Sequence, residues 1–270
     1  MVSFATREGS QVPFSQASAG CGASSGLKPD NFRFWSARAA PLGSGAPLAS
    51  LSQSILSGLG RPGKEGGRAE PATGYEFPLE YCYLRTKQCP SLAGLGVRSK
   101  RIVIKDINVY ALGIYVDATA ARSSLAAFKK RPAEDLERDQ AFYDAVVSSP
   151  NVEKTLRLVI SSRLVDNKKF VEALEEQLVP RLKKAGEPGA IDAFRNQFDR
   201  ISFSEGMEVV FSSTDNKNLA VKVAGEQKGV ICSPALCSSL FDIYLGSDPV
   251  SKDAKATFGR SLAAALKEDK

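Results

Sequence analysis

The chain has 270 residues, of which 43% are hydrophobic and 24% charged, a composition typical of a globular protein. Most of its net charge of +6 comes from residues 1–69, so the remainder is nearly balanced and lacks the clustered cations that nucleic-acid binding requires. The sequence has no histidine, the commonest general base, and no apolar run of the roughly 18 residues that would span a membrane.

The cysteines of the chain predict neither a metal site nor a disulfide framework. Cys21, Cys82, Cys89, Cys232 and Cys237 are odd in number and include no CxxC pair. We therefore expect free thiols, which fit a reducing compartment, and neither a metal nor a cofactor.

Residues 1–69 differ in composition from the rest of the chain. They are rich in Ser, Ala and Gly, poor in acidic residues and basic overall, which is typical of an organelle transit peptide. A disordered tail without a targeting role remains an alternative. We predict that residues 1–69 are a transit peptide and disordered linker, and that residues 70–270 form one folded domain.

The folded part begins with short segments rich in β-branched and aromatic residues, separated by Gly and Pro. This pattern is typical of antiparallel strands. In chain order we expect strands over 81–87, 92–98, 101–104 and 108–116, then a helix over 136–149 and a strand over 154–162.

A long helix is predicted over 167–185, where Asp166 provides an N-cap and apolar residues recur every four positions. Pro180 should bend it. The expected elements after it are a helix over 189–199, strands over 207–213, 219–223 and 229–231, and helices over 234–246 and 250–268. Strands and helices segregated in this way predict an α+β fold.

Two polar residues stand out in adjacent predicted strands, Arg98 and Tyr110. A hairpin would bring them together. An arginine inside a sheet needs an anionic partner, either an acidic side chain or a ligand. The alternatives are that Arg98 faces water at the rim of the sheet and that Tyr110 only packs in the core.

Four segments together resemble the chalcone isomerase superfamily: GVRSKRIVIKDINVYALGIYVD (96–117), LKKAGEPG (182–189), EGMEVVFSS (205–213) and FDIYLGSDPVSKDAKATFGRSLA (241–263). The preceding AEPATGYEFP (69–78) is more similar to the plastid fatty-acid-binding branch of that superfamily. The resemblance implies an open-faced β-sandwich, in which a large antiparallel sheet is covered on one face by a layer of helices.

The resemblance also implies that the isomerase site has been lost. Arg98 matches the arginine of the enzymes, but their threonine, tyrosine and asparagine positions hold Tyr110, Phe170 and Gln177, and a later threonine position holds Ile243. In the fatty-acid-binding branch the matching residues hold a carboxylate, here Arg98 and Tyr110 with help from Gln177. The expected lining of the apolar pocket, each member of which could equally be plain core, is Phe170, Leu174, Ile243 and Leu112.

We therefore expect a monomeric, non-catalytic protein of the chloroplast stroma. Its expected ligand is a free fatty acid of medium to long chain, bound in support of fatty-acid metabolism or storage. Two alternatives remain open: a chalcone-flavanone isomerase and a non-catalytic enhancer of flavonoid synthesis.

Overall fold

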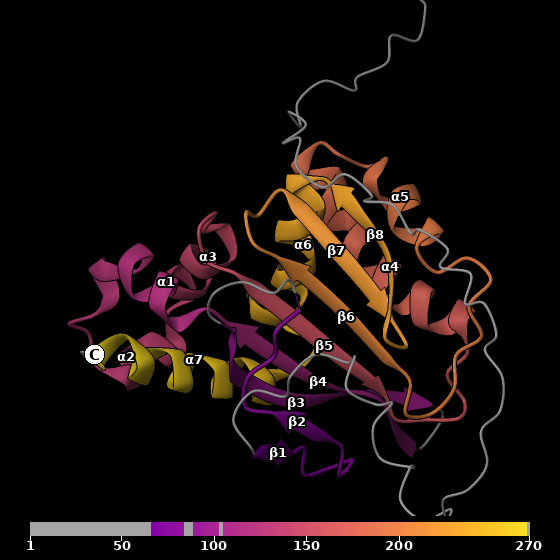
Figure 1. Ribbon diagram of the computed structural model, residues 1–270, viewed down its shortest axis with the longest axis horizontal. Helices are drawn as coiled ribbons and strands as arrows, with labels where there is room; N and C mark the ends of the chain where they lie inside the picture. The colour runs from indigo at the N-terminus through magenta and orange to yellow at the C-terminus, as the bar shows by residue number, and fades with distance from the viewer. Residues whose placement is uncertain (1–65, 84–88, 103–104, 269–270) are drawn as a thin grey trace, which may run out of the picture. The chain divides into compact units, whose positions relative to one another are not determined.

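A large antiparallel sheet dominates the computed structural model, which describes residues 66–83, 89–102 and 105–268. Within these residues the sheet has six strands, and each pairs with the next along the chain (Figure 1). They are β3 (Ser91–Ile102), β4 (Lys105–Val116), β5 (Lys154–Ile160), β6 (Glu208–Ser213), β7 (Asn218–Val223) and β8 (Glu226–Cys232).

Helices cover one face of this sheet. They are α1 (Ala118–Ser124), the short 3-10 helix η1 (Ala126–Phe128), α2 (Ala133–Arg138), α3 (Gln140–Ser148), α4 (Asn167–Ala185), α5 (Ala190–Asn196), α6 (Pro234–Leu245) and α7 (Lys252–Lys267). In Figure 1 the strands face the viewer, and α4, α5 and α6 lie behind β6 to β8. The predicted α+β fold, with an antiparallel sheet covered on one face by helices, is confirmed.

The last helix, α7, packs against β3 at a glycine. A Cβ atom on Gly96 would lie 2.8 Å from Oγ of Ser251 and 2.9 Å from Cβ of Ala254, closer than atoms of side chains normally approach. Glycine at this position therefore allows the start of α7 to lie directly on the strand that carries Arg98.

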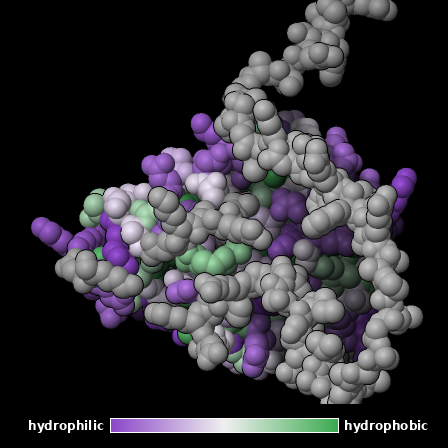
Figure 2. All heavy atoms as spheres, viewed as in Figure 1, coloured by the Kyte–Doolittle hydropathy of each residue, from purple (hydrophilic) through white to green (hydrophobic). Residues whose placement is uncertain are grey.

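The other face of the sheet is partly covered by a small two-stranded sheet of β1 (Gly67–Ala69) and β2 (Glu76–Pro78). Phe77 is fully buried there with Ala111 and Tyr115. A Cβ on Gly113 would lie 2.5 Å from Cδ1 of Phe77, so the ring packs where a larger residue has no room. Elsewhere this face, turned toward the viewer in Figure 2, shows hydrophilic atoms around patches of hydrophobic surface.

Several predicted boundaries differ from those of the structure. The predicted domain start at residue 70 falls just after β1. The predicted strands over 92–98 and 101–104 are one strand, β3, as far as Ile102, and residues 103–104 lie outside the described residues. Of the predicted strand over 81–87, residues 81–83 are not in a strand and the rest lies outside the described residues. The predicted helix over 136–149 is two helices, the end of α2 and all of α3, which are separated at Asp139. Helix α1 was not predicted, because it is too short to show a helical period.

The predicted helix over 167–185 is confirmed as α4, with Pro180 inside it. The Asp166 side chain accepts a hydrogen bond from the backbone N–H of Lys169 at 2.8 Å, as expected of an N-cap. At the other end, Gly186 takes the left-handed conformation, φ 81°, that ends many helices. Local sequence signals therefore set both ends of this helix.

The expectation that the cysteines are free thiols is wrong for Cys82 and Cys89, which form a disulfide with each other, and for Cys232, which is also disulfide-bonded. The Cα atoms of Cys82 and Cys89 are 4.7 Å apart because the neighbouring residues Tyr81 and Pro90 are joined by a backbone hydrogen bond of 2.9 Å, a pairing that spacing in the sequence does not reveal. Cys237 is a free, buried thiol. Within the described ranges, no cluster of His, Cys, Asp and Glu side chains is arranged to hold a metal ion. The helices in these ranges include none that is both long and apolar enough to cross a membrane.

Candidate functional site

The site begins with an irregularity in the pairing of β3 and β4. Arg98 pairs with Tyr110 and Ser99 pairs with Asn108, which leaves Val109 as the extra residue of a β-bulge. Val109 and Tyr110 therefore both join the core on the helix-covered face, whereas Asn108 contacts the carbonyl of Ala72 with its side-chain amide. The bulge brings Val109 beside Arg98.

Arg98 is buried, with 7% of its surface exposed. Its Nη1 atom donates to the hydroxyl oxygen of Tyr110 at 3.3 Å and to the backbone carbonyl of Ala173, in α4, at 3.1 Å. The guanidinium carbon also lies 5.8 Å from the centre of the Tyr110 ring. The alternative in which Arg98 faces water is wrong, and the predicted meeting of Arg98 with Tyr110 is found.

Most hydrogen-bond donors of Arg98 have no partner among the residues that the structure describes. A guanidinium has five N–H groups. Two of them, on Nη1, have partners, and in the described part of the chain the three on Nε and Nη2 have none. Arg98 also takes part in none of the ion pairs among the described residues; the nearby Glu176 pairs with Lys100 at 3.8 Å. Burial lowers the pKa of Arg98, but Tyr110, Tyr244 and Glu176 outweigh that effect and raise it, so the side chain is charged.

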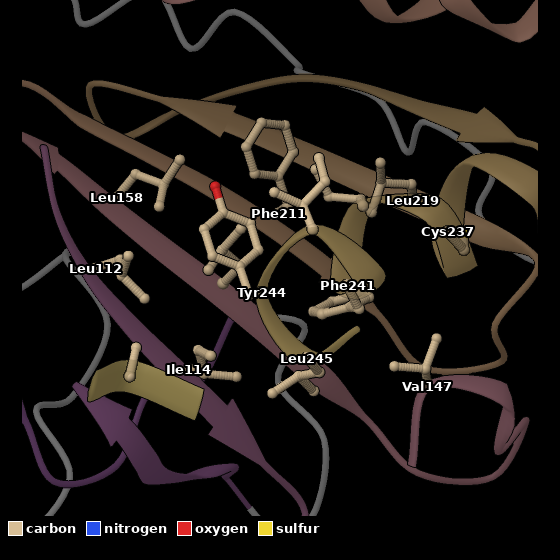
Figure 3. Close-up of a cluster of buried hydrophobic side chains, with 14 of the residues drawn as sticks. Leu112, Ile114, Val147, Leu158, Phe211, Leu219, Cys237, Phe241, Tyr244 and Leu245 are labelled. Atoms are coloured by element: carbon tan, nitrogen blue, oxygen red, sulfur yellow. The ribbon is translucent and has the colours of Figure 1, made fainter. Parts of the chain in front are cut away.

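A second tyrosine, Tyr244, completes the polar group and was not predicted. Its hydroxyl lies 2.9 Å from the hydroxyl of Tyr110, and both side chains are buried. Figure 3 shows Tyr244, from α6, among buried hydrophobic side chains of the sheet and helices. Helix α6 is buried on nearly all sides, so its periodicity gives no sign of which residue faces Arg98. The only sign of Tyr244 as a site residue in the sequence was its hydroxyl group in an otherwise mostly apolar helix.

Arg98 lies at the inner end of a cavity of about 180 Å³. This inner end is formed by the buried members of the lining, which are Arg98, Val109, Val165 and Ala173. Ile107, which is partly buried, also lines the cavity, and the other lining residues are exposed: Lys100, Leu164, Lys169, Glu172 and Glu176. The cavity therefore leads from the surface along apolar side chains to one buried positive charge.

The four predicted pocket residues lie elsewhere. Phe170, Leu174, Ile243 and Leu112 are fully buried members of the core, and none of them lines this cavity. Phe170, for example, packs edge-on against the Tyr110 ring at 6.0 Å between ring centres. The periodicity on which the prediction was based marks burial, which a core residue and a pocket residue share.

Gln177 also lies away from the polar group. Its side-chain oxygen accepts a hydrogen bond from Nη1 of Arg181 at 3.1 Å, one turn further along α4. Arg181 in turn donates to Asp242 at 2.7 Å. The structure thus brings together Arg98 and Tyr110 but not Gln177, and the third polar group is Tyr244.

Comparison with known proteins assigns the chain to a family. The sequence profile named Chalcone-flavanone isomerase matches residues 85–268. The chain belongs to the chalcone-flavanone isomerase family. Among family members, the Hordeum vulgare protein named chalcone-flavanone isomerase is 32% identical over 188 residues, which are 65% of this chain and 80% of that protein.

Other relatives in the family carry a different name. Fatty-acid-binding protein 1 of Arabidopsis thaliana is 27% identical over 195 residues, covering 70% of this chain and 68% of the relative. Fatty-acid-binding protein 2 of the same plant is 27% identical over 208 residues, but the match spans only 51% of its length. The crystal structure of an Arabidopsis thaliana fatty-acid binding protein aligns with a TM-score of 0.67 and 26% identity, over 75% of this chain and all of that one. The predicted membership, including the similarity to the fatty-acid-binding branch, is confirmed.

Proposed function

We propose that the protein binds a free fatty acid, holds its carboxylate at Arg98 and performs no reaction on it. The observation that carries this proposal is a buried, charged arginine with three N–H groups free of partners among the described residues. The edge formed by Nε and Nη2 matches the two oxygens of a carboxylate. Such a pairing compensates the desolvation of both charges.

The hydrocarbon tail of the acid would lie along the apolar wall of the cavity. This wall includes Val109, Ile107 and Leu164, a large hydrophobic residue that is 57% exposed. A bound chain would cover Leu164. At about 0.8 kcal/mol per buried methylene, a chain of about twelve carbons gains roughly 9 kcal/mol. Association costs of at least about 4 kcal/mol leave about 5 kcal/mol, or sub-millimolar binding, from the tail of a medium to long chain alone, and the hydrogen bonds of the carboxylate add to it.

The chemistry of the polar group supports binding without catalysis. Arg98, Tyr110 and Tyr244 donate hydrogen bonds, and burial raises the pKa of Tyr244 well above its ordinary value, so this phenol is no base near neutral pH. The positions where the resemblance to the isomerases implies catalytic hydroxyl and amide groups hold Phe170, Gln177 and Ile243, all outside the polar group. The names of two Arabidopsis relatives support the same conclusion.

Native mass spectrometry tests this proposal. Protein purified from a bacterial host should carry a bound mass equal to that of a free fatty acid, and the Arg98→Met variant, purified in parallel, should carry much less. A chalcone substrate should cyclise no faster with the protein than without it. An Arg98-dependent rate clearly above the spontaneous one would instead support an isomerase.

We further propose that the protein acts in the plastid stroma. The support is the acid-poor, Ser-rich composition of residues 1–69 beside a nearly neutral remainder. A fluorescent protein fused behind residues 1–70 should accumulate in chloroplasts. Retention of the fusion in the cytosol would contradict this location without affecting the proposed ligand.

A further inference from the structure

Two basic residues of β3 contact helix α4 beside the cavity. Arg98 donates to the backbone carbonyl of Ala173 at 3.1 Å. Lys100, two residues further along the strand, forms an ion pair with Glu176 at 3.8 Å. All four residues line the cavity. The side chains of Lys100 and Glu176 are 55% and 57% exposed, so this ion pair lies toward the surface, whereas Arg98 is buried.

The geometry of α4 directs the Glu176 carboxylate toward Arg98. Glu176 follows Ala173 by three residues, which places it about 4.5 Å along the helix axis on the same face. Side chains of an α-helix lean toward its N-terminus, so that of Glu176 leans over the turn where Ala173 binds Arg98. Glu172, the other acidic residue of the lining, leans the other way and pairs with Lys168 at 3.8 Å.

A carboxylate in this place competes with the ligand for the same donors. Groups joined by a short flexible link meet at an effective concentration on the order of millimolar, well above that of a dilute free fatty acid. The N–H groups of Arg98 that have no partner among the described residues would accept either carboxylate. Among these same residues Arg98 is in no ion pair, and Glu176 pairs with Lys100 instead. Glu176 is also among the groups that outweigh burial and raise the pKa of Arg98.

We propose that Lys100 is a positioning residue, which holds the Glu176 carboxylate away from Arg98 and thereby leaves the guanidinium free for the carboxylate of the ligand. This inference rests on the proposed function and deepens it, because it names the pair that sets the affinity of the site for anions. A ligand with a neutral head group gains little from the charge of Arg98, so the pair should act on anionic ligands. Exposed ion pairs shift an equilibrium only a few-fold, and the expected effects are of that size.

A double-mutant cycle tests the role of Lys100. Dodecanoate and 1-dodecanol are titrated against the wild type, Lys100→Met, Glu176→Gln and the double variant. Lys100→Met should weaken dodecanoate binding about threefold, because Glu176 then turns to Arg98, and Glu176→Gln should strengthen it about twofold or more. The double variant should match Glu176→Gln, because Lys100 acts through Glu176. The affinity for dodecanol should be the same in all four proteins.

Other roles of the ion pair give different patterns. If the pair only closed the cavity or stabilised the fold, both single variants would change the affinity in the same direction and for both ligands, which overturns the inference. A loss in Lys100→Met that persists beside Glu176→Gln also overturns it, because Lys100 would then act on the ligand directly. Lys100→Arg keeps the charge and should bind dodecanoate like the wild type; a loss as large as that of Lys100→Met contradicts the inference.

Lys168→Met provides the matched control. It removes the same charge from an ion pair of the same length on α4, but the carboxylate that it releases, Glu172, leans away from Ala173. Dodecanoate affinity should therefore stay unchanged, and a loss equal to that of Lys100→Met would overturn the role of Glu176.

Proton–nitrogen NMR of the arginine Nε–H groups gives a test without a ligand. The signal of Arg98 should shift in Lys100→Met, as Glu176 binds the guanidinium, and should return in the double variant with Glu176→Gln. An Arg98 signal that is the same in all three proteins contradicts the inference.

The same titrations distinguish the two levels of the argument. Wild-type protein that binds no dodecanoate overturns the proposed function and this inference with it. Wild-type binding that Arg98→Met abolishes, together with unaffected binding in Lys100→Met and Glu176→Gln, overturns only the role of Lys100.

Discussion

Arg98 and Tyr110 lie directly opposite each other on β3 and β4, and Nη1 of Arg98 donates to the Tyr110 hydroxyl at 3.3 Å. The same Nη1 atom also donates to the backbone carbonyl of Ala173 at 3.1 Å, which holds the guanidinium against α4. The side chain is thus fixed through one nitrogen, and its remaining donors are available at the inner end of the cavity. Fixing the arginine in advance reduces the entropy lost on binding.

The Tyr110→Phe variant should bind dodecanoate several-fold more weakly than the wild type. A neutral hydrogen bond contributes about 1 kcal/mol, which corresponds to about fivefold in affinity. Phenylalanine preserves the edge-on packing against Phe170, but loss of the hydroxyl removes a buried partner of Arg98 and of Tyr244, so stability should fall by about 1–3 kcal/mol. Isothermal titration calorimetry measures the affinity, and unchanged binding would remove Tyr110 from the site.

Gln177→Ala should change dodecanoate affinity by less than about twofold. Its side chain is engaged with Arg181, and a half-exposed contact of this kind on a helix contributes only a few tenths of a kcal/mol. The same calorimetric titration tests this expectation. A loss as large as that of Tyr110→Phe would show that Gln177 turns toward the ligand after all.

The packing of Phe77 against β4 predicts an effect on stability far from the cavity. In Gly113→Ala the new Cβ would lie 2.5 Å from Cδ1 of Phe77, so the ring has to move, at a cost of about 1–3 kcal/mol. Gly189→Ala is the matched control, because a Cβ there meets nothing within 4 Å, and we expect a change below about 1 kcal/mol. Urea denaturation measures both. Equal stabilities would mean that Phe77 does not pack on Gly113.

Lys154 should make the free energy of unfolding rise with pH between 7 and 9. The side chain is fully buried and donates to the carbonyls of Val146 and Ser149, and burial lowers its pKa to about 8. The unfolded chain keeps the ordinary value of 10.5, so above pH 8 it binds more protons than the folded protein. Stability then increases with pH, by about 1.4 kcal/mol over this range.

Lys154→Met serves as the control for this effect and should lack the increase. The range stops at pH 9 because burial raises the pKa of the Cys237 thiol to about 11, so at higher pH the unfolded chain loses this proton first, which opposes the increase due to Lys154. Urea denaturation at a series of pH values gives the comparison. Parallel curves for the two proteins would contradict the role assigned to Lys154.

The sequence predicted the parts of the molecule that depend on local signals. The ends of α4 follow from Asp166 and Gly186, and the meeting of Arg98 with Tyr110 follows from two adjacent strands. The bulge at Val109 could not be predicted, because it depends on the register between strands and leaves no mark in the alternation of side chains. Yet this bulge puts Val109 on the helix-covered face, where it lines the cavity together with Arg98.

Tertiary contacts explain the remaining differences between the expected site and the observed cavity. Phe170 and Ile243 were expected in the pocket, but full burial in the core produces the same pattern in the sequence. Tyr244 is the neighbour of Ile243 on a helix buried almost all round, so only the folded structure shows that its hydroxyl reaches Tyr110. Gln177 lies on the correct helix, but its interaction is with Arg181.

The most direct test of fatty-acid binding at Arg98 is a titration of dodecanoate and its methyl ester against the wild type and Arg98→Met. Hydrogen bonds to a charged group contribute about 1.5–3 kcal/mol, so the variant should lose at least about tenfold in affinity for the acid. The ester carries no charge; it should bind the wild type weakly and be almost insensitive to the substitution. Equal affinity of the wild type for acid and ester, or an acid affinity unchanged by Arg98→Met, would contradict the account.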